Sequence, residues 1–123
     1  MKNDKEKFKI EMKRRIYRWT LALVVFVDSL PDSQSSRRIA DQLVRSGTSV
    51  GANYIESQAA SSKKDFINFL HYALKSANES KFWICLLRDS GKADKEEANK
   101  LLNELVELAN ILGASLLTLK GKR

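Results

Sequence analysis

The chain has 123 residues, of which 43% are hydrophobic and 30% are charged. This length and balance predict one globular domain over residues 1–123 with a real core, and they exclude collagen-like and disordered chains. The formal net charge of +7 suits a negatively charged partner such as nucleic acid, but a lysine-rich surface that only keeps the protein in solution has the same composition.

The first predicted helix covers residues 8–30 and follows a charged N-terminal segment. Its apolar residues recur at helical spacing. They are Met12, Ile16, Trp19, Leu23, Phe26 and Leu30. Between Trp19 and Val27 the helix is apolar on almost every side. Pro31 is expected to end it, because proline disfavours a helical conformation in the preceding residue.

The second predicted helix, residues 36–60, has an apolar arc that covers nearly half of its circumference. Ser35 or Ser36 is expected to cap its first turn. Gly47 and Gly51 lie within the arc, although a glycine in a helix interior costs about 1 kcal/mol relative to alanine. We therefore expect a neighbouring backbone to approach closely at these glycines.

Polar side chains border this arc and face the third predicted helix, where Ala73 and Ala77 leave room for close packing. Their spacing of three and four residues predicts a stripe of hydrogen-bonding groups at the edge of the core. The predicted network contains Ser46, Ser49, Asn53, Glu56, Ser76 and Glu79.

The third and fourth predicted helices cover residues 63–89 and 95–119. Ser62 and Asp65 have the spacing of a capping box, and Asp94 and Glu97 repeat this signal before the fourth helix. Short polar loops separate all four helices. The predicted fold class is therefore all-α, an antiparallel up-down-up-down four-helix bundle.

Three of the predicted helices carry more apolar surface than one bundle buries. The surplus is clearest at residues 19–27, residues 82–87 and the broad leucine stripe of residues 98–119. Exposed apolar patches of this extent usually mark association between proteins. We therefore expect a homo-oligomer.

Basic residues concentrate near both ends of the chain. If one surface collects them, each added subunit multiplies the number of phosphate contacts, and the affinity for nucleic acid falls steeply with salt. The predicted nucleic-acid-binding residues are Lys9, Lys13, Arg14, Arg15, Arg18, Lys120, Lys122 and Arg123. Few aromatic residues lie between them, so sequence-specific stacking on bases is not expected.

The residues that carry chemistry in enzymes are sparse. His71 has no nucleophile or carboxylate placed against it, and one His with one Cys does not make a zinc site. Cys85 is expected to be a buried apolar residue in a reducing compartment. Glu56 and Glu79 are an acid/base pair in one interpretation and hydrogen-bonding groups in the other, which the surrounding serines favour. We predict no catalytic, metal-binding or cofactor-binding residues, no cofactor and no small-molecule substrate.

The segment Leu21–Val27 is too short to cross a bilayer and has no signal-peptide cleavage site after it. We therefore expect a cytoplasmic protein without a membrane partner.

Two patterns in the second and third predicted helices resemble a known family. The first pairs Leu30-Pro31 with Gln42-Leu43, Arg45-Ser46, Ser49-Val50, Ala52-Asn53 and Glu56. The second is Asp65-Phe66, Phe69-Leu70, Ala73, Ser76 and Glu79. In order and spacing they resemble the four-helix-bundle proteins encoded in intervening sequences of bacterial 23S ribosomal RNA genes, the S23 type. The chain departs from the family pattern at Tyr54-Ile55, Ser57 and Lys75.

This resemblance implies a small bacterial protein that forms a ring-like homopentamer and has no established enzymatic activity. It also implies a kinship with basic pentameric accessory proteins of diversity-generating retroelements, which bind nucleic acid and a reverse transcriptase. Two hypotheses follow. The first is a non-enzymatic, oligomeric accessory protein that binds RNA or a nucleoprotein, and the second is an oligomeric scaffold that recruits another protein without binding nucleic acid.

Overall fold

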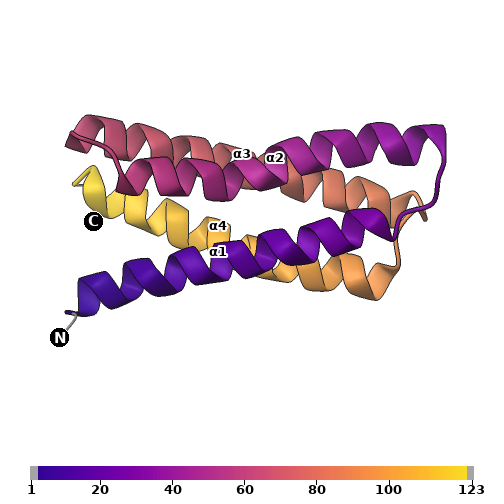
Figure 1. Ribbon diagram of the computed structural model, residues 1–123, viewed down its shortest axis with the longest axis horizontal. Helices are drawn as coiled ribbons and strands as arrows, with labels where there is room; N and C mark the ends of the chain where they lie inside the picture. The colour runs from indigo at the N-terminus through magenta and orange to yellow at the C-terminus, as the bar shows by residue number, and fades with distance from the viewer. Residues whose placement is uncertain (1–2, 122–123) are drawn as a thin grey trace.

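The computed structural model describes residues 3–121, which form an all-helical bundle (Figure 1). Its helices are α1 (Asp4–Asp28), α2 (Gln34–Gln58), α3 (Lys63–Asp89) and α4 (Lys95–Leu119). In Figure 1 the chain runs from left to right in α1 and α3 and returns in α2 and α4. The beginning of α1 and the end of α4 therefore lie at the same end of the bundle. The predicted all-α four-helix fold is confirmed.

The start of each helix is fixed by a polar side chain that accepts a hydrogen bond from the backbone of the first turn. Asn3 caps α1, since its Oδ1 accepts from the Glu6 amide at 2.8 Å, so this helix begins four residues before the predicted start at residue 8. Ser33 caps α2 by accepting from the Ser36 amide, so the prediction of Ser35 or Ser36 as the cap is wrong. The reason is that Ser36 itself turns inward and is buried.

The caps of α3 and α4 are the predicted ones. Ser62 Oγ accepts from the Asp65 amide at 3.1 Å, and Asp94 Oδ2 accepts from the Glu97 amide at 3.0 Å. Both helices have the predicted bounds. Gly91 follows α3 with a φ of +77°, a conformation that costs glycine nothing but strains other residues, so the chain turns sharply there.

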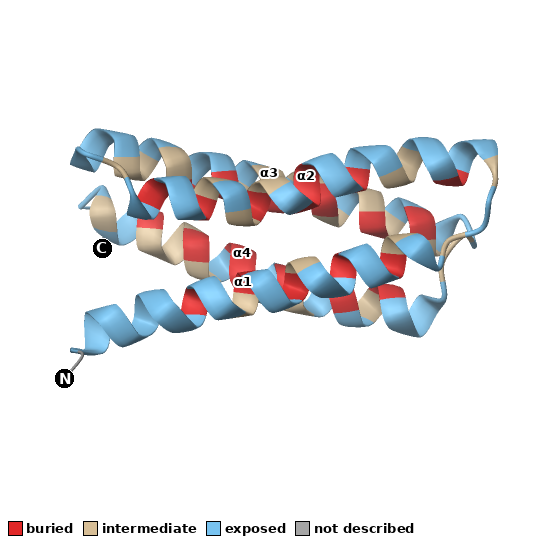
Figure 2. Ribbon diagram, viewed as in Figure 1, coloured by how far each residue is buried: buried red, intermediate tan, exposed pale blue. Residues whose placement is uncertain are grey.

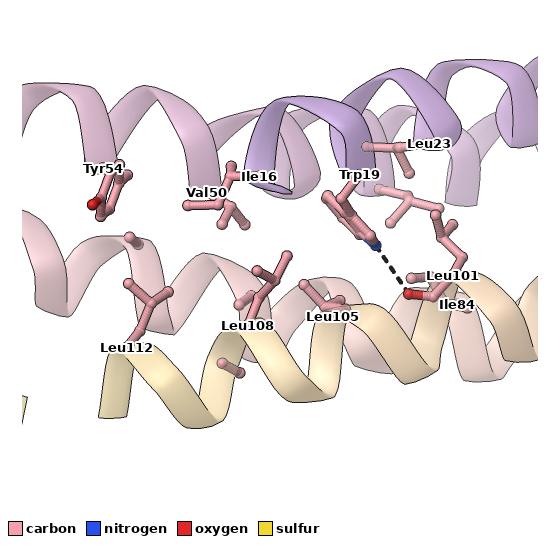
Figure 3. Close-up of a cluster of buried hydrophobic side chains, with 14 of the residues drawn as sticks. Ile16, Trp19, Leu23, Val50, Tyr54, Ile84, Leu101, Leu105, Leu108 and Leu112 are labelled. Carbon is pink, nitrogen blue, oxygen red and sulfur yellow. Dashed lines mark hydrogen bonds between the residues drawn. The ribbon is translucent and has the colours of Figure 1, made fainter. Parts of the chain in front are cut away.

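The core runs along the axis of the bundle, where all four helices contribute buried side chains (Figure 2). Each helix packs against its two neighbours, α1 against α2 and α4, and α3 against α2 and α4. Trp19 lies near the middle of the core, and its Nε1 donates a hydrogen bond to the Leu101 carbonyl at 2.9 Å (Figure 3). This bond satisfies the polar atom of a buried indole and joins α1 to α4.

The glycines of α2 lie against side chains of α1, and not against the backbone of a neighbouring helix. An ideal Cβ on Gly47 would lie 2.3 Å from Leu23 Cδ2, and one on Gly51 would lie 3.2 Å from Ile16 Cγ2. The expectation of close backbone packing at these glycines is therefore wrong. They are needed because large α1 side chains, including Leu23, pack into the space that their missing side chains leave.

A pair of substitutions separates this packing role from helix propensity. Gly113 lies in α4 with no atom within 4 Å of an ideal Cβ, so Gly113→Ala should raise the free energy of unfolding by about 0.5–1 kcal/mol. Gly47→Leu should lower it by about 1–3 kcal/mol, because overpacking outweighs the better propensity. Urea unfolding followed by circular dichroism measures both, and an increase in stability for Gly47→Leu would contradict the packing role.

Candidate functional site

The surface of α1 carries half of the cations predicted to bind nucleic acid. Lys9, Lys13, Arg14 and Arg18 are all exposed. Lys7, Arg14 and Arg18 are separated by seven and four residues, so they lie on one outward face of the helix. Arg14 Nη1 lies 3.5 Å from Glu11 Oε2, an exposed pair that leaves the guanidinium open to solvent.

Arg15 does not share this exposed surface. Its Nε and Nη2 donate to the two carboxylate oxygens of Glu104 at 3.1 and 2.8 Å, and Nη2 also lies 3.1 Å from Glu107 Oε1. The hydrogen bonds that Arg15 donates to the Glu104 carboxylate raise the pKa of its guanidinium above its ordinary value. Arg15 therefore joins α1 to the acidic side of α4, and its charge is balanced within the bundle.

The remaining predicted cations are divided among different faces. Lys13 and Arg14 border the groove between α1 and α2, whereas Arg18 borders the α1/α4 groove together with Lys100. Lys120 lies on the α3/α4 face, which is across the bundle from the α1/α2 groove. Lys122 and Arg123 lie outside the described residues. The structure thus places Lys7, Arg14 and Arg18 on one outward face of α1, Lys13 at the α1/α2 groove, and Lys120 apart from them.

Beyond Arg18 the outer surface of α1 becomes apolar. Trp19 points inward and is buried, but its neighbours Leu21, Val24 and Val25 are exposed, Val25 by 71%. Tyr17 and Ile10 extend this apolar surface along the α1/α2 groove, where Ile55 of α2 meets them. We call Ile10, Tyr17, Leu21, Val24, Val25 and Ile55 the α1 apolar strip. Its members Leu21, Val24 and Val25 belong to the surplus predicted at residues 19–27, whereas Trp19 is buried and does not.

A second exposed apolar region lies on α3. Phe82 is 61% exposed, and Tyr72 and Leu86 are also exposed. Trp83 beside it is half-buried and packs edge to face against Phe82, with ring centroids 5.0 Å apart. The surplus predicted at residues 82–87 is therefore present in part, since Phe82 and Leu86 are exposed whereas Ile84 and Leu87 are buried in the core.

The predicted polar network is only partly formed. Ser46 Oγ and the Oγ of Ser80 on α3 lie 2.8 Å apart in the core. Ser49 and Asn53 bond carbonyls of their own helix, at Arg45 and Ser49 respectively. Among the described residues, the side chains of Glu56 and Ser76 have no hydrogen-bond partner, although the Ser76 carbonyl accepts from Ser80.

Glu79 binds partners that the sequence interpretation missed. Its Oε2 accepts from Arg45 Nη2 across the α2/α3 interface and from Trp83 Nε1 at 3.0 Å. Arg45 belongs to the first signature and directly precedes Ser46, a member of the predicted network. This adjacency was the sequence signal that could have indicated Arg45 as a partner of Glu79. This arrangement gives Glu79 a structural role, and exposed Glu56 does not pair with it.

The residues with potential for catalysis or metal binding stand apart. His71 is exposed on α3, and Cys85 is half-buried rather than buried as predicted. Within residues 3–121 no cluster of three His, Cys, Asp or Glu side chains is arranged to hold a metal ion. The arrangement offers surfaces for association and charge contacts.

One helix, α4, is long and apolar enough to cross a membrane by length and composition alone. Seven of its residues are buried in the bundle, among them Leu105 and Leu108 at the centre of the core. A core helix of a bundle passes the same test, so this is weak support for a membrane segment.

Comparison with known proteins agrees with the two signatures. The family model described as 23S rRNA-intervening sequence protein matches residues 9–114. The crystal structure of a protein of unknown function from the S23 ribosomal protein family of Bacteroides thetaiotaomicron VPI-5482 superposes with a TM-score of 0.82. It is 31% identical, and the match covers 88% of this chain and 96% of that one. No curated protein matches. The chain belongs to the 23S rRNA-intervening sequence protein family.

Proposed function

We propose that this protein is a non-enzymatic, self-associating accessory protein of the cytoplasm that binds RNA, alone or within a nucleoprotein, through the outer surface of α1. The observation that carries the proposal is the division of this surface. Its N-terminal half presents Lys7, Lys13, Arg14 and Arg18 to solvent, and its C-terminal half is apolar. A helix with this pattern can meet phosphates with one half and another subunit with the other.

Self-association is supported by the α1 apolar strip. Leu21 and Val25 are exposed in the single subunit. Covering them with a partner would contribute about 25 cal/mol of favourable free energy for each Å² of apolar surface buried. A second copy of the chain is always available to cover it. We infer a ring of up-down-up-down bundles, for which the family resemblance favours five subunits.

Association makes the basic surface stronger. Three or four cations on one subunit make few phosphate contacts, but a closed ring repeats them around its axis. When several subunits of one ring contact the same RNA, the overall affinity for that RNA increases, although each subunit makes no additional contact. Glu104 and Glu107 belong to α4, and their carboxylates already pair with Arg15. They therefore do not neutralise the exposed cations on the outer surface of α1.

A salt titration tests the RNA-binding proposal. Binding to a structured RNA should weaken as salt increases, and Arg14→Gln with Arg18→Gln should reduce the slope of log K against log salt by about one for each lost phosphate contact. Fluorescence anisotropy at several salt concentrations measures the slope. The matched control is Arg37→Gln with Arg38→Gln, which removes two exposed cations from the start of α2. Absence of binding at low salt, or equal losses in both variants, would reject the proposal.

A scaffold that recruits another protein is the second candidate function. It is favoured by Tyr72, Phe82 and Leu86, which are exposed on α3, outside the basic surface. Co-purification of a protein partner without RNA, abolished by Phe82→Asp and unaffected by Arg14→Gln with Arg18→Gln, would support this candidate in place of RNA binding.

A further inference from the structure

A cavity opens at the end of the bundle where α1 begins and α4 ends. All four helices line it, and its walls are mostly apolar, with Phe8, Phe66, Leu70 and Ile111 among them. Its volume is about 380 Å³, which lies within the range of sites that hold small molecules. It is separate from the α1 apolar strip and belongs to neither the RNA-binding proposal nor the scaffold alternative.

Tyr54 supplies the cavity with a hydroxyl that no protein group uses. The Tyr54 side chain lines the cavity and is only 4% exposed. Among residues 3–121 no buried side-chain polar atom lacks a hydrogen-bond partner, so the Tyr54 hydroxyl, which makes no hydrogen bond to the protein, keeps some access to the cavity. Figure 3 shows the hydroxyl on the side of the ring away from Val50. Burial raises the pKa of this hydroxyl, so it stays protonated and able to donate. An acceptor atom on a ligand in the cavity would give this hydroxyl a hydrogen bond.

The charged groups of the cavity are both cationic, since Lys5 and Lys9 of α1 bring two ammonium groups. Its remaining polar groups are neutral and can donate as well as accept: the Gln58 amide and the hydroxyls of Ser115 and Thr118. No carboxylate is among the described residues that line it. Apolar walls with positive charge and a free hydroxyl complement a molecule that has an apolar body and an anionic head, whereas a cationic ligand would meet like charge.

We propose that this cavity binds a medium-chain monocarboxylate, with its alkyl chain against Phe66 and Leu70 and its carboxylate held by Lys5, Lys9 and the Tyr54 hydroxyl. Each methylene removed from water contributes about 0.8 kcal/mol, so a chain of this length gains most of its affinity from the walls. The three donors select the charged head. The carboxylate is a bound ligand and undergoes no reaction.

Isothermal titration with decanoate, kept below its micelle concentration, tests the proposal on the full chain. One saturable site per subunit is expected. Lys5→Gln with Lys9→Gln should weaken binding about three- to tenfold, as should Tyr54→Phe, which keeps the ring and removes only the hydroxyl. Lys92→Gln with Lys95→Gln should leave binding unchanged, because α4 begins at Lys95 and the start of α4 lies at the opposite end of the bundle (Figure 1). Decanol should bind more weakly than decanoate to the unmodified protein.

Ser115→Leu provides an independent test, because it places a larger side chain on the cavity wall from α4. It should abolish decanoate binding while urea unfolding remains cooperative. Lack of saturable binding would overturn the proposal, and so would binding that none of the cavity variants weakens. Binding of phosphatidylglycerol vesicles without binding of monomeric decanoate would also overturn it, since a lipid surface would then be the ligand.

Discussion

Replacing Trp19 by alanine should lower the free energy of unfolding by about 3–5 kcal/mol, the largest single effect we expect on stability. Trp19 is buried between α1 and α4, with Gly47 of α2 beside its ring. The substitution leaves a cavity the size of an indole and removes the hydrogen bond to the Leu101 carbonyl. Since small domains are typically stable by about 5–15 kcal/mol, this loss removes a substantial share of the stability.

Trp83→Ala is the matched control, because this tryptophan is half-buried at the edge of α3. It should cost less than half as much. Trp19→Phe should fall between them, since it keeps an aromatic ring but removes the Nε1 donor. Urea unfolding followed by circular dichroism compares all three. Equal losses for Trp19→Ala and Trp83→Ala would contradict the central place of Trp19 in the core.

The helices could be predicted from the sequence because periodicity and caps are local signals. Ser62 and Asp94 mark the starts of α3 and α4 by the same spacing that the structure shows. Asn3 was missed because the residues after it are charged on all sides and give no apolar period. Ser33 was missed because three serines near the start of α2 are equally good caps, and only burial of Ser36 decides among them.

The packing partners could not be predicted, because they depend on how each helix is rotated. The glycines of α2 were correctly placed in its apolar arc, but the sequence does not show that Leu23 of α1 fills the space beside Gly47. The same limit applied to the candidate site. Arg14 and Arg15 are adjacent in the sequence, yet a rotation of about 100° per residue directs one to solvent and the other to Glu104.

Family membership was predictable because the two signatures are patterns of residue identity rather than of geometry. They contain Arg45 and Glu79, which the structure joins across the α2/α3 interface. A pair that links two helices restricts residue choice at both positions. This explains in physical terms why these charged residues stand in signatures that also contain buried residues such as Leu43 and Ala73.

Leu21→Asp with Val25→Asp should abolish self-association while leaving the folded subunit intact. Both side chains are exposed in the single subunit, so the substitutions cost its bundle little. In an interface they would bury two unpaired carboxylates, which is strongly unfavourable. The dissociation constant should rise at least about 100-fold, since each 1.4 kcal/mol is a factor of ten. Sedimentation equilibrium at micromolar concentration measures this change.

The charge-matched control is Asn103→Asp with Asn110→Asp, which adds two carboxylates at exposed positions of α4. It should sediment like the unmodified protein. In the proposed ring, the cations of several subunits contact the same RNA, so the affinity for RNA depends on association. The Leu21/Val25 variant should therefore also lose RNA affinity, although Arg14 and Arg18 are intact. An unmodified protein that is monomeric at micromolar concentration, or a variant that associates as strongly as the control, would show that the α1 apolar strip is not the contact between subunits.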